Sequence, residues 1–208
     1  MKLLLFSEAP EYNFQEQFED FFQIPMKNLK VAFIPNARDL TVPTKRQHAT
    51  ENLEKIVSLG FDVEEIDLLN TDKTKLKKIL ETKDIIWMHG GFVSNLAKAM
   101  RVSGLTEYLE KLLDDGLMYV GSSAGSMVLG ENLDTAVWLG GEEDSEAKNY
   151  EGLGFVDFNI YPHYNPKLKK EIWKFTKQGE IYYLLEDGQA IGVKDGDIKQ
   201  YGDIETIK

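Results

Sequence analysis

Short apolar runs alternate with amphipathic stretches along the chain. Runs of mostly apolar residues predict strands at 3–6, 30–34, 63–66, 85–88 and 117–122. Between them, apolar residues recur at helical spacing, and the helix predicted over about 43–59 has Leu53, Ile56 and Val57 on one face and ends at Gly60. Further helices are predicted around 76–80, 93–101 and 105–115. This alternation is typical of βα units around a mostly parallel sheet, so we expect an α/β fold.

The C-terminal third has a different pattern. A glycine- and acid-rich loop over 140–154 precedes a strand-like alternation at 155–161 and a basic amphipathic helix at 167–177. Three further apolar segments, at 181–185, 189–193 and 198–201, are separated by Asp-Gly turns at 187–188 and 195–196. They predict a small antiparallel appendix. No repeat or linker interrupts the pattern, and residues 1–208 are predicted to form a single domain.

Composition narrows the classes of function. The 208 residues carry a net charge of −11, which disfavours a phosphate-tracking nucleic-acid surface. Cysteine is absent, and only His48, His89 and His163 are present, so we expect no metal site and no cofactor. The N-terminal apolar run is too short for a signal peptide, and no run approaches the length of a membrane span. We expect a cytoplasmic protein, a monomer or homodimer, with no membrane or nucleic-acid partner.

Residues 121–125 read Gly-Ser-Ser-Ala-Gly and directly follow a predicted strand. They match G-x-S-x-G, in which a sharp strand-to-helix turn projects the central serine hydroxyl above the sheet. By position the nucleophile is Ser123, rather than Ser122 or Ser126. A turn of small residues selected for packing gives the same pattern, so the surrounding residues must decide between the two interpretations.

A serine nucleophile needs a neighbouring base, for which histidine is the usual choice. His163 follows the strand predicted at 155–161 and lies between Pro162 and Pro166. Because sites in open α/β sheets lie at the carboxyl ends of strands, Ser123 and His163 are expected at the same edge. A loop histidine that caps nearby backbone remains the alternative. His89 is more readily explained as a structural histidine.

The reaction also needs hydrogen-bond donors for the oxyanion of a tetrahedral intermediate. The amide of Ala124, at the predicted helix N-terminus, is one candidate. The loop at Gly90 and Gly91, after the strand at 85–88, could supply the other. A tight strand-to-helix turn would explain the same two glycines.

Taken in order, these motifs resemble the peptidase E and cyanophycinase family of serine peptidases. The similarity covers about residues 30–200 and is most specific at Ser-Ala-Gly-Ser, 123–126, and Tyr-Pro-His-Tyr, 161–164. It implies a flavodoxin-like three-layer sandwich akin to class I glutamine amidotransferases, and dipeptidase-like hydrolysis of short peptides. It also implies Ser123 as nucleophile, His163 as base, and amides near Gly91 and Ala124 as the oxyanion hole.

The third catalytic residue should be an acid that orients the imidazole. The resemblance implies that it lies between the serine and the histidine, where the candidates are Glu131, Asp134, Glu142, Glu143 and Asp144. Spacing from both ends favours the cluster 142–144, and Glu142 is our prediction.

Two departures from the family pattern concern the substrate. Phe92 follows Gly90-Gly91 where family members commonly have asparagine, and its ring could line or narrow the substrate pocket. The family uses an arginine beyond the catalytic histidine to recognise aspartate, whereas the segment after His163 contains only lysines, at 167, 169, 170 and 174. Lysine cannot reproduce a bidentate carboxylate contact, so we expect no strong preference for aspartate.

Two other classes of protein fit part of the pattern. An α/β-hydrolase esterase shares G-x-S-x-G and the order serine, acid, histidine, but it usually has a longer chain. A catalytically silent relative that binds peptides or a partner protein would explain Phe92 and the absence of the arginine.

Overall fold

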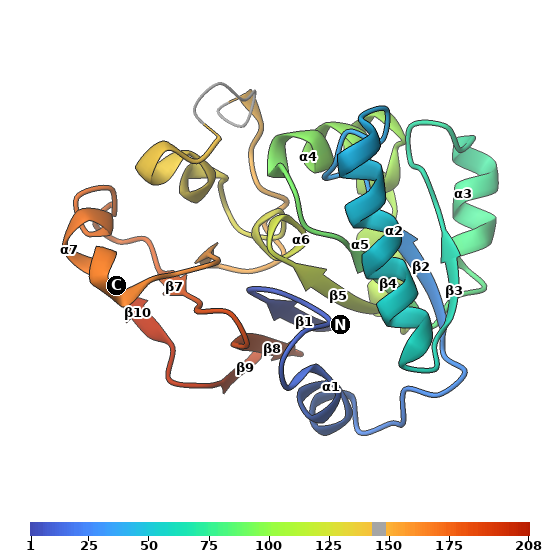
Figure 1. Cartoon of the computed structure of the whole chain (residues 1–208), viewed down its shortest axis with the longest axis horizontal. Helices are drawn as coiled ribbons and strands as arrows, with labels where there is room; N and C mark the ends of the chain where they lie inside the picture. Colours follow the sequence, from blue (N-terminus) through green and yellow to red (C-terminus); the bar gives the residue numbers. More distant parts are fainter. Residues whose placement is uncertain (143–148) are drawn as a thin grey trace.

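The computed structural model describes residues 1–142 and 149–208 and is built around a seven-stranded sheet (Figure 1). The strand order is β3-β2-β4-β5-β1-β8-β9, and the first five strands run parallel. These five are β1 (Lys2–Phe6), β2 (Lys30–Ile34), β3 (Asp62–Glu65), β4 (Ile85–Met88) and β5 (Met118–Ser122). The α/β class and the mostly parallel central sheet predicted from the sequence are confirmed.

Helices cover both faces of this sheet. In β1, Leu3 and Leu5 enter one core while Leu4 and Phe6 enter the other, because successive residues of a strand face opposite sides. The first core is covered by α3 (Lys73–Leu80), α4 (Val93–Val102), the 3-10 helix η1 (Leu105–Glu107) and α5 (Leu109–Asp114). The second is covered by α1 (Phe14–Phe22) and α2 (Pro43–Ser58). Burial on both faces explains why the parallel strands read as apolar runs rather than as alternations.

The C-terminal third divides between two sheets. A hairpin of β8 (Ala190–Lys194) and β9 (Asp197–Tyr201) extends the main sheet antiparallel to β1. The second sheet has the order β10-β7-β6, from β6 (Asn159–Tyr161), β7 (Tyr182–Leu184) and β10 (Glu205–Ile207). In Figure 1 this sheet lies beside β8 and β9, far from β3. The predicted antiparallel appendix is therefore correct for β8 and β9, whereas β7 lies in the second sheet, where it pairs antiparallel with β10 and parallel with β6.

The remaining helices of the described residues are short. They are α6 (Ala124–Met127), α7 (Lys169–Ile172) and the 3-10 helices η2 (Asp134–Gly140) and η4 (Pro166–Leu168). The helix predicted over 167–177 is thus shorter than expected, and only 159–161 of the predicted strand 155–161 is a strand. Helix α2 agrees with its prediction to within one residue. No helix in the described residues is both long and apolar enough to span a membrane.

Candidate active site

A strained turn joins β5 to α6 at Ser123, whose backbone angles are φ 50° and ψ −110°. Two glycines permit the chain to turn so closely. A Cβ atom on Gly121 would lie 2.6 Å from the carbonyl oxygen of Gly125, and one on Gly125 would lie 2.2 Å from that of Met88. Both positions therefore need glycine for close backbone approach. This strand-to-helix turn at residues 121–125, which we call the elbow, presents Ser123 at the carboxyl edge of the sheet.

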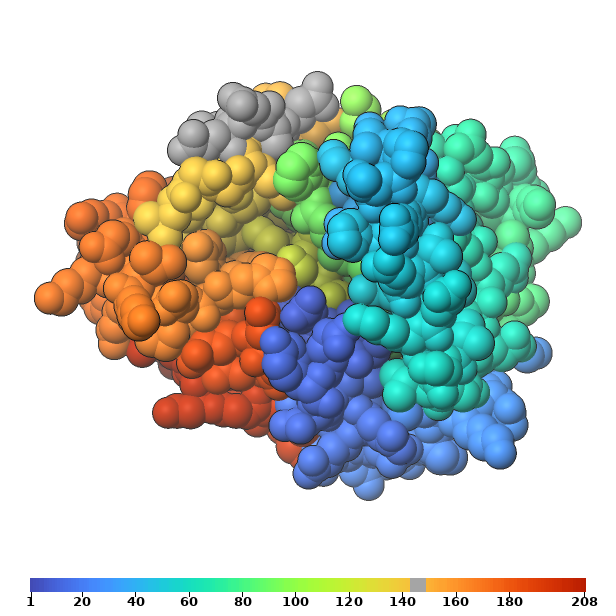
Figure 2. Space-filling model, in the orientation of Figure 1, coloured from blue at the N-terminus to red at the C-terminus, as the bar shows by residue number. Residues whose placement is uncertain are grey.

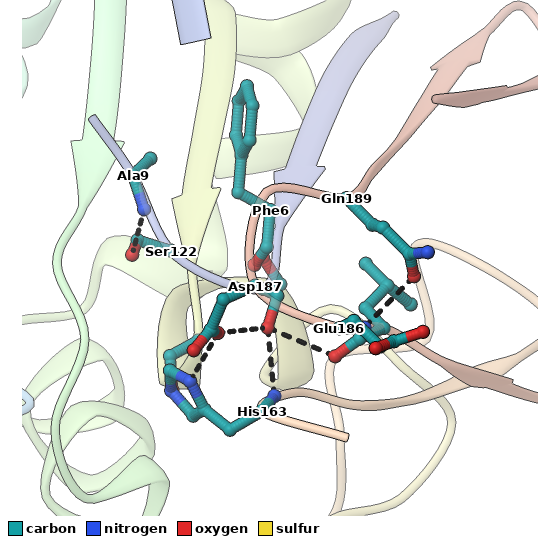
Figure 3. Close-up of polar contacts among 11 residues, drawn as sticks. Phe6, Ala9, Ser122, His163, Glu186, Asp187 and Gln189 are labelled. Atoms are coloured by element: carbon teal, nitrogen blue, oxygen red, sulfur yellow. Dashed lines mark hydrogen bonds and ion pairs between the residues drawn. The ribbon is translucent and has the colours of Figure 1, made fainter. Parts of the chain in front are cut away.

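The two neighbouring serines make structural hydrogen bonds. The buried Ser126 hydroxyl donates to the carbonyl oxygen of Phe6 at 2.7 Å. The Ser122 hydroxyl accepts from the amide of Ala9 at 3.0 Å, as Figure 3 shows. Only Ser123 of the three is partly exposed, so the structure agrees with its selection by position in the motif.

The imidazole of His163 lies between a hydroxyl and a carboxylate. Its Nε2 atom is 3.1 Å from the Oγ of Ser123. Its Nδ1 atom is 2.7 Å from Oδ1 of Asp187, a contact that Figure 3 shows. A carboxylate accepts a hydrogen bond, so Nδ1 carries the proton and Nε2 is left as an acceptor facing the serine. The structure thus brings together the two residues predicted from sequence and adds an acid that was not predicted.

The register of the second sheet explains this acid. Tyr161 in β6 pairs with Leu184 in the parallel strand β7. His163 and Asp187 follow these two strands by two and three residues, so both leave the sheet at the same edge. The sequence signal was the Asp-Gly turn at 187–188, which was interpreted only as a hairpin turn.

The buried hydroxyl of Ser7 connects these segments. It accepts a hydrogen bond from the backbone amide of His163 at 2.8 Å. It lies 2.9 Å from Oδ1 of Asp187 and 3.1 Å from the carbonyl oxygen of Leu185, and its single proton can serve one of them at a time. Ser7 follows β1, so the central sheet holds the histidine loop and the Asp187 turn in place.

The structure does not place Glu142, the predicted third residue, beside the imidazole of His163. The Glu142 carboxylate accepts hydrogen bonds from the amide of Val93 at 2.6 Å and the hydroxyl of Ser94 at 2.9 Å. It therefore caps the N-terminus of α4, where the helix has unsatisfied amides and a favourable dipole. Asp134, the alternative, forms an ion pair with Lys177.

The other acids considered do not contact the imidazole in the described residues. Glu131 borders a different pocket, beside Phe155 and Val156. Glu143 and Asp144 lie outside the described residues. The carboxylate that contacts the imidazole, that of Asp187, follows the histidine in the sequence.

Of the two predicted oxyanion donors, Gly91 lines the same cavity as Ser123, and Ala124 directly follows the serine. Gly91 has φ +152°, and a Cβ there would lie 2.5 Å from the carbonyl oxygen of Ala37, so only glycine fits. Neither its amide nor that of Ala124 has a hydrogen-bond partner within residues 1–142 and 149–208. Both amides remain candidates for an incoming oxyanion.

A cavity of about 260 Å³ opens at the serine. It is lined by residues at or just after the ends of β1, β2, β4 and β5, by His163 after β6 and by Asn52 of α2: Glu8, Ala9, Arg38, Asn52, His89, Gly90, Gly91, Ser122, Ser123 and His163. The space-filling view is hollowed near its centre, where blue, green and olive segments meet (Figure 2). Arg38, Glu8 and Asn52 were not singled out from the sequence, because they come from loops and a helix far from the motifs.

Arg38 and His89 form a pair in this cavity. The Arg38 Nε donates to Nε2 of His89 at 3.0 Å, which leaves the proton of the neutral imidazole on Nδ1. Burial, and secondarily the charge of Arg38, lowers the pKa of His89 to about 3. His89 is therefore neutral at ordinary pH, as expected of a structural histidine, although it also lines the cavity.

Phe92 lines a neighbouring pocket of about 450 Å³ rather than the cavity at the serine. Its ring is about half exposed and lies 5.2 Å from the ammonium of Lys45. Arg38 borders both hollows. Among the described residues, no three acidic or histidine side chains are grouped to hold a metal ion.

Comparison with known proteins agrees with this geometry. Residues 3–201 match the model of peptidase family S51, and the chain belongs to that family. It is accordingly a serine-type peptidase. An uncharacterized peptidase of Listeria monocytogenes is 28% identical over 85% of this chain and 88% of its own, and a peptidase E of a Nostoc species is 26% identical over 97% and 86%.

Solved structures support the fold. The crystal structure of a Listeria monocytogenes protein assigned to peptidase E has a TM-score of 0.78 at 24% identity and covers 96% of this chain and 97% of its own. A peptidase from an acI-B1 actinobacterium has a TM-score of 0.76 at 17% identity, with 99% and 88% covered. The predicted resemblance to peptidase E is confirmed.

We expect substitutions of Asp187 and Glu142 to have opposite effects on rate and stability. Asp187→Asn should lower the rate of Ser123 acylation by several orders of magnitude, since an amide in this position favours the wrong imidazole tautomer and costs about ten thousand-fold in a well-studied triad. Glu142→Gln should cost about 1 kcal/mol of stability through its helix cap, with a much smaller loss of rate. Labelling kinetics with a fluorophosphonate, together with urea unfolding, would measure both. A larger rate loss for Glu142→Gln would restore the acid predicted from sequence.

The buried, neutral His89 should make the free energy of unfolding depend on pH. In the unfolded chain it binds a proton below its ordinary pKa of about 6.5, whereas the folded protein keeps it neutral down to about 3. The free energy of unfolding should therefore fall as pH drops through this window, by roughly 1 kcal/mol per pH unit from this group. Urea unfolding at about pH 7 and about pH 5 should show a shallower fall for His89→Gln than for wild type. Equal slopes would contradict the assignment.

Proposed function

We propose that the protein hydrolyses short peptides through an acyl-enzyme intermediate on Ser123, with His163 as general base and Asp187 as the acid that orients it. The observation that carries the proposal is the continuous series of contacts from hydroxyl to imidazole to carboxylate, at 3.1 Å and 2.7 Å. A serine hydroxyl becomes a competent nucleophile only with such a base within hydrogen-bond distance.

The proposed reaction follows from the protonation states. The Ser123 oxygen attacks the peptide carbonyl as its proton passes to Nε2 of His163, and the Asp187 carboxylate stabilises the imidazolium that forms. The amides of Gly91 and Ala124 would donate to the oxyanion. His163 then gives the proton to the leaving amine, and a water molecule activated by the same base releases the acyl group.

The size of the cavity supports short peptides as substrates. Its volume of about 260 Å³ is just below the range of about 300–1,000 Å³ typical of ligand pockets. Its walls come from several loops of the carboxyl edge and the helix α2, which leaves space for only a few residues beside Ser123. A small, polar hollow of this kind favours a peptide of two or three residues over a folded protein chain.

One cation in the cavity bears on the side-chain preference. No arginine follows His163, but Arg38 supplies a guanidinium to the cavity from the loop after β2. Its terminal nitrogens have no ion-pair partner in the described part of the chain, and its Nε is held by His89. We therefore propose Arg38 as the group that would bind a substrate carboxylate, which weakens the expectation of no aspartate preference.

The first prediction concerns the nucleophile. Ser123→Ala should fold normally, because the hydroxyl makes no core contact, and should lower turnover on the order of a million-fold. Ser126→Ala is the matched control: it removes a buried hydroxyl of the same motif that bonds to the Phe6 carbonyl and not to His163, and it should retain far more activity than Ser123→Ala. Hydrolysis of a panel of dipeptides, with circular dichroism to check folding, would measure both. Activity of Ser123→Ala within about tenfold of wild type would exclude this nucleophile.

The second prediction concerns Arg38. Replacing it by glutamine keeps a donor for His89 but removes the charge, and should lower kcat/KM for Asp-containing dipeptides by about tenfold or more relative to Leu-containing ones. Arg38→Lys should give an intermediate ratio, because lysine offers a point charge without the two parallel bonds. Rates on matched Asp, Asn and Leu dipeptides would decide. An unchanged Asp-to-Leu ratio in Arg38→Gln would exclude this role.

A further inference from the structure

Glu8 lies in the loop after β1, between two residues fixed to the catalytic groups. On one side, the Ser7 hydroxyl contacts the backbone of His163 and the carboxylate of Asp187. On the other, the Ala9 amide donates to the hydroxyl of Ser122, next to the nucleophile (Figure 3). The Glu8 side chain lines the same cavity as Ser123 and is partly buried.

The carboxylate of Glu8 has no ion-pair or hydrogen-bond partner within the described part of the chain. Glu11, three residues later in the same loop, forms an ion pair with Lys55 of α2. Burial, and secondarily the nearby carboxylate of Asp187, raises the pKa of Glu8. A cation brought into the cavity would offset both the burial of the Glu8 carboxylate and its repulsion by Asp187. The site therefore favours a positively charged group on the substrate.

The strand order fixes where such a cation would lie. Glu8 follows β1, which is adjacent to β5, and neighbouring strands are about 4.8 Å apart. In a peptide, the α-nitrogen lies about 2.5 Å from the carbonyl carbon of the same residue. An ammonium–carboxylate hydrogen bond adds about 2.8 Å, so an oxygen that binds the α-nitrogen must lie within about 5.3 Å of the attacked carbon. Glu8 is a candidate for such a group, because its loop leaves the strand next to the elbow and its side chain lines the cavity at Ser123.

We propose that Glu8 binds the α-ammonium group of the residue whose carbonyl carbon Ser123 attacks, so that the enzyme acts on peptides with a free N-terminus. This inference rests on the proposed function. An acylated or N-extended peptide would place a neutral amide against the unpaired carboxylate, which leaves it desolvated without compensation. Asn52, which lines the same cavity, has a buried Oδ1 without a hydrogen-bond partner and offers a second acceptor to the ammonium.

Glu8 and Arg38 then act on different parts of the substrate. Arg38 follows β2, and the strand order β2-β4-β5-β1 places it on the opposite side of Ser123 from Glu8. An Asp-containing dipeptide with a free N-terminus carries an α-ammonium group for Glu8 and a side-chain carboxylate for Arg38. The cavity therefore has one complementary charge on each side of the nucleophile, which orients the peptide and disfavours its reversed binding.

The test compares a dipeptide with its N-acetylated form, using the dipeptide cleaved fastest in the panel. Wild type should prefer the free dipeptide in kcat/KM by more than about tenfold. Glu8→Gln should lower kcat/KM for the free dipeptide by roughly 10- to 100-fold and for the acetylated one by much less, so that the preference collapses. Glu11→Gln, the matched control in the same loop, should keep the wild-type preference because its carboxylate is already paired with Lys55.

Other outcomes would overturn the inference. Equal losses on both substrates in Glu8→Gln, with an equal loss in the rate of fluorophosphonate labelling of Ser123, would mean that Glu8 acts through His163 and Asp187. Equal rates of wild type on the two substrates would also exclude ammonium recognition, while leaving the proposed peptidase reaction intact. Absence of both hydrolysis and labelling in wild type would overturn the proposed function, and this inference with it.

Discussion

The site depends on the close backbone approach of the elbow to the strands on either side of β5. On one side, the Cα of Gly125 packs so near the Met88 carbonyl in β4 that no side chain fits. On the other, the amide of Ser123 donates to the Phe6 carbonyl of β1 at 3.1 Å, and the Ser126 hydroxyl donates to the same oxygen. A residue with positive φ is held in this conformation only when its surroundings over-determine it, and here three strands do so.

The central sheet and the two principal residues could be predicted because local patterns determine them. Strands buried on both faces must be apolar throughout, and the steric needs of the elbow leave glycines on both sides of Ser123. His163 could be placed because it follows a strand and parallel strands share a carboxyl edge. Helix α1 was not predicted, although its apolar residues recur at helical spacing from Phe14 to Phe22.

The acid could not be found by the same reasoning, because it depends on a pairing between segments distant in sequence. Tyr182–Leu184 could have paired with the strand that follows it, through the Asp187-Gly188 turn, and the pattern of turn residues favoured that hairpin. Instead β7 pairs parallel with β6, and this choice alone brings Asp187 to His163. Glu142 met the spacing criterion equally well, but the free amides at the start of α4 bind its carboxylate. Spacing along the chain cannot distinguish a helix cap from a triad acid.

The order of strands also determines the charges around the nucleophile. Each parallel strand ends at the same edge, so the first residues of the following loops form a row: Arg38 after β2, neutral His89 after β4, Ser123 after β5 and Glu8 after β1. Two strands, β4 and β5, lie between the strands that carry Arg38 and Glu8, so the two charges do not pair with each other. The Arg38 guanidinium is held by His89, and no cation in the described residues pairs with Glu8. A fold with these loops on adjacent strands would form an internal ion pair instead. The strand order β2-β4-β5-β1 therefore leaves the Arg38 guanidinium and the Glu8 carboxylate available to a substrate that carries both a carboxylate and an ammonium group.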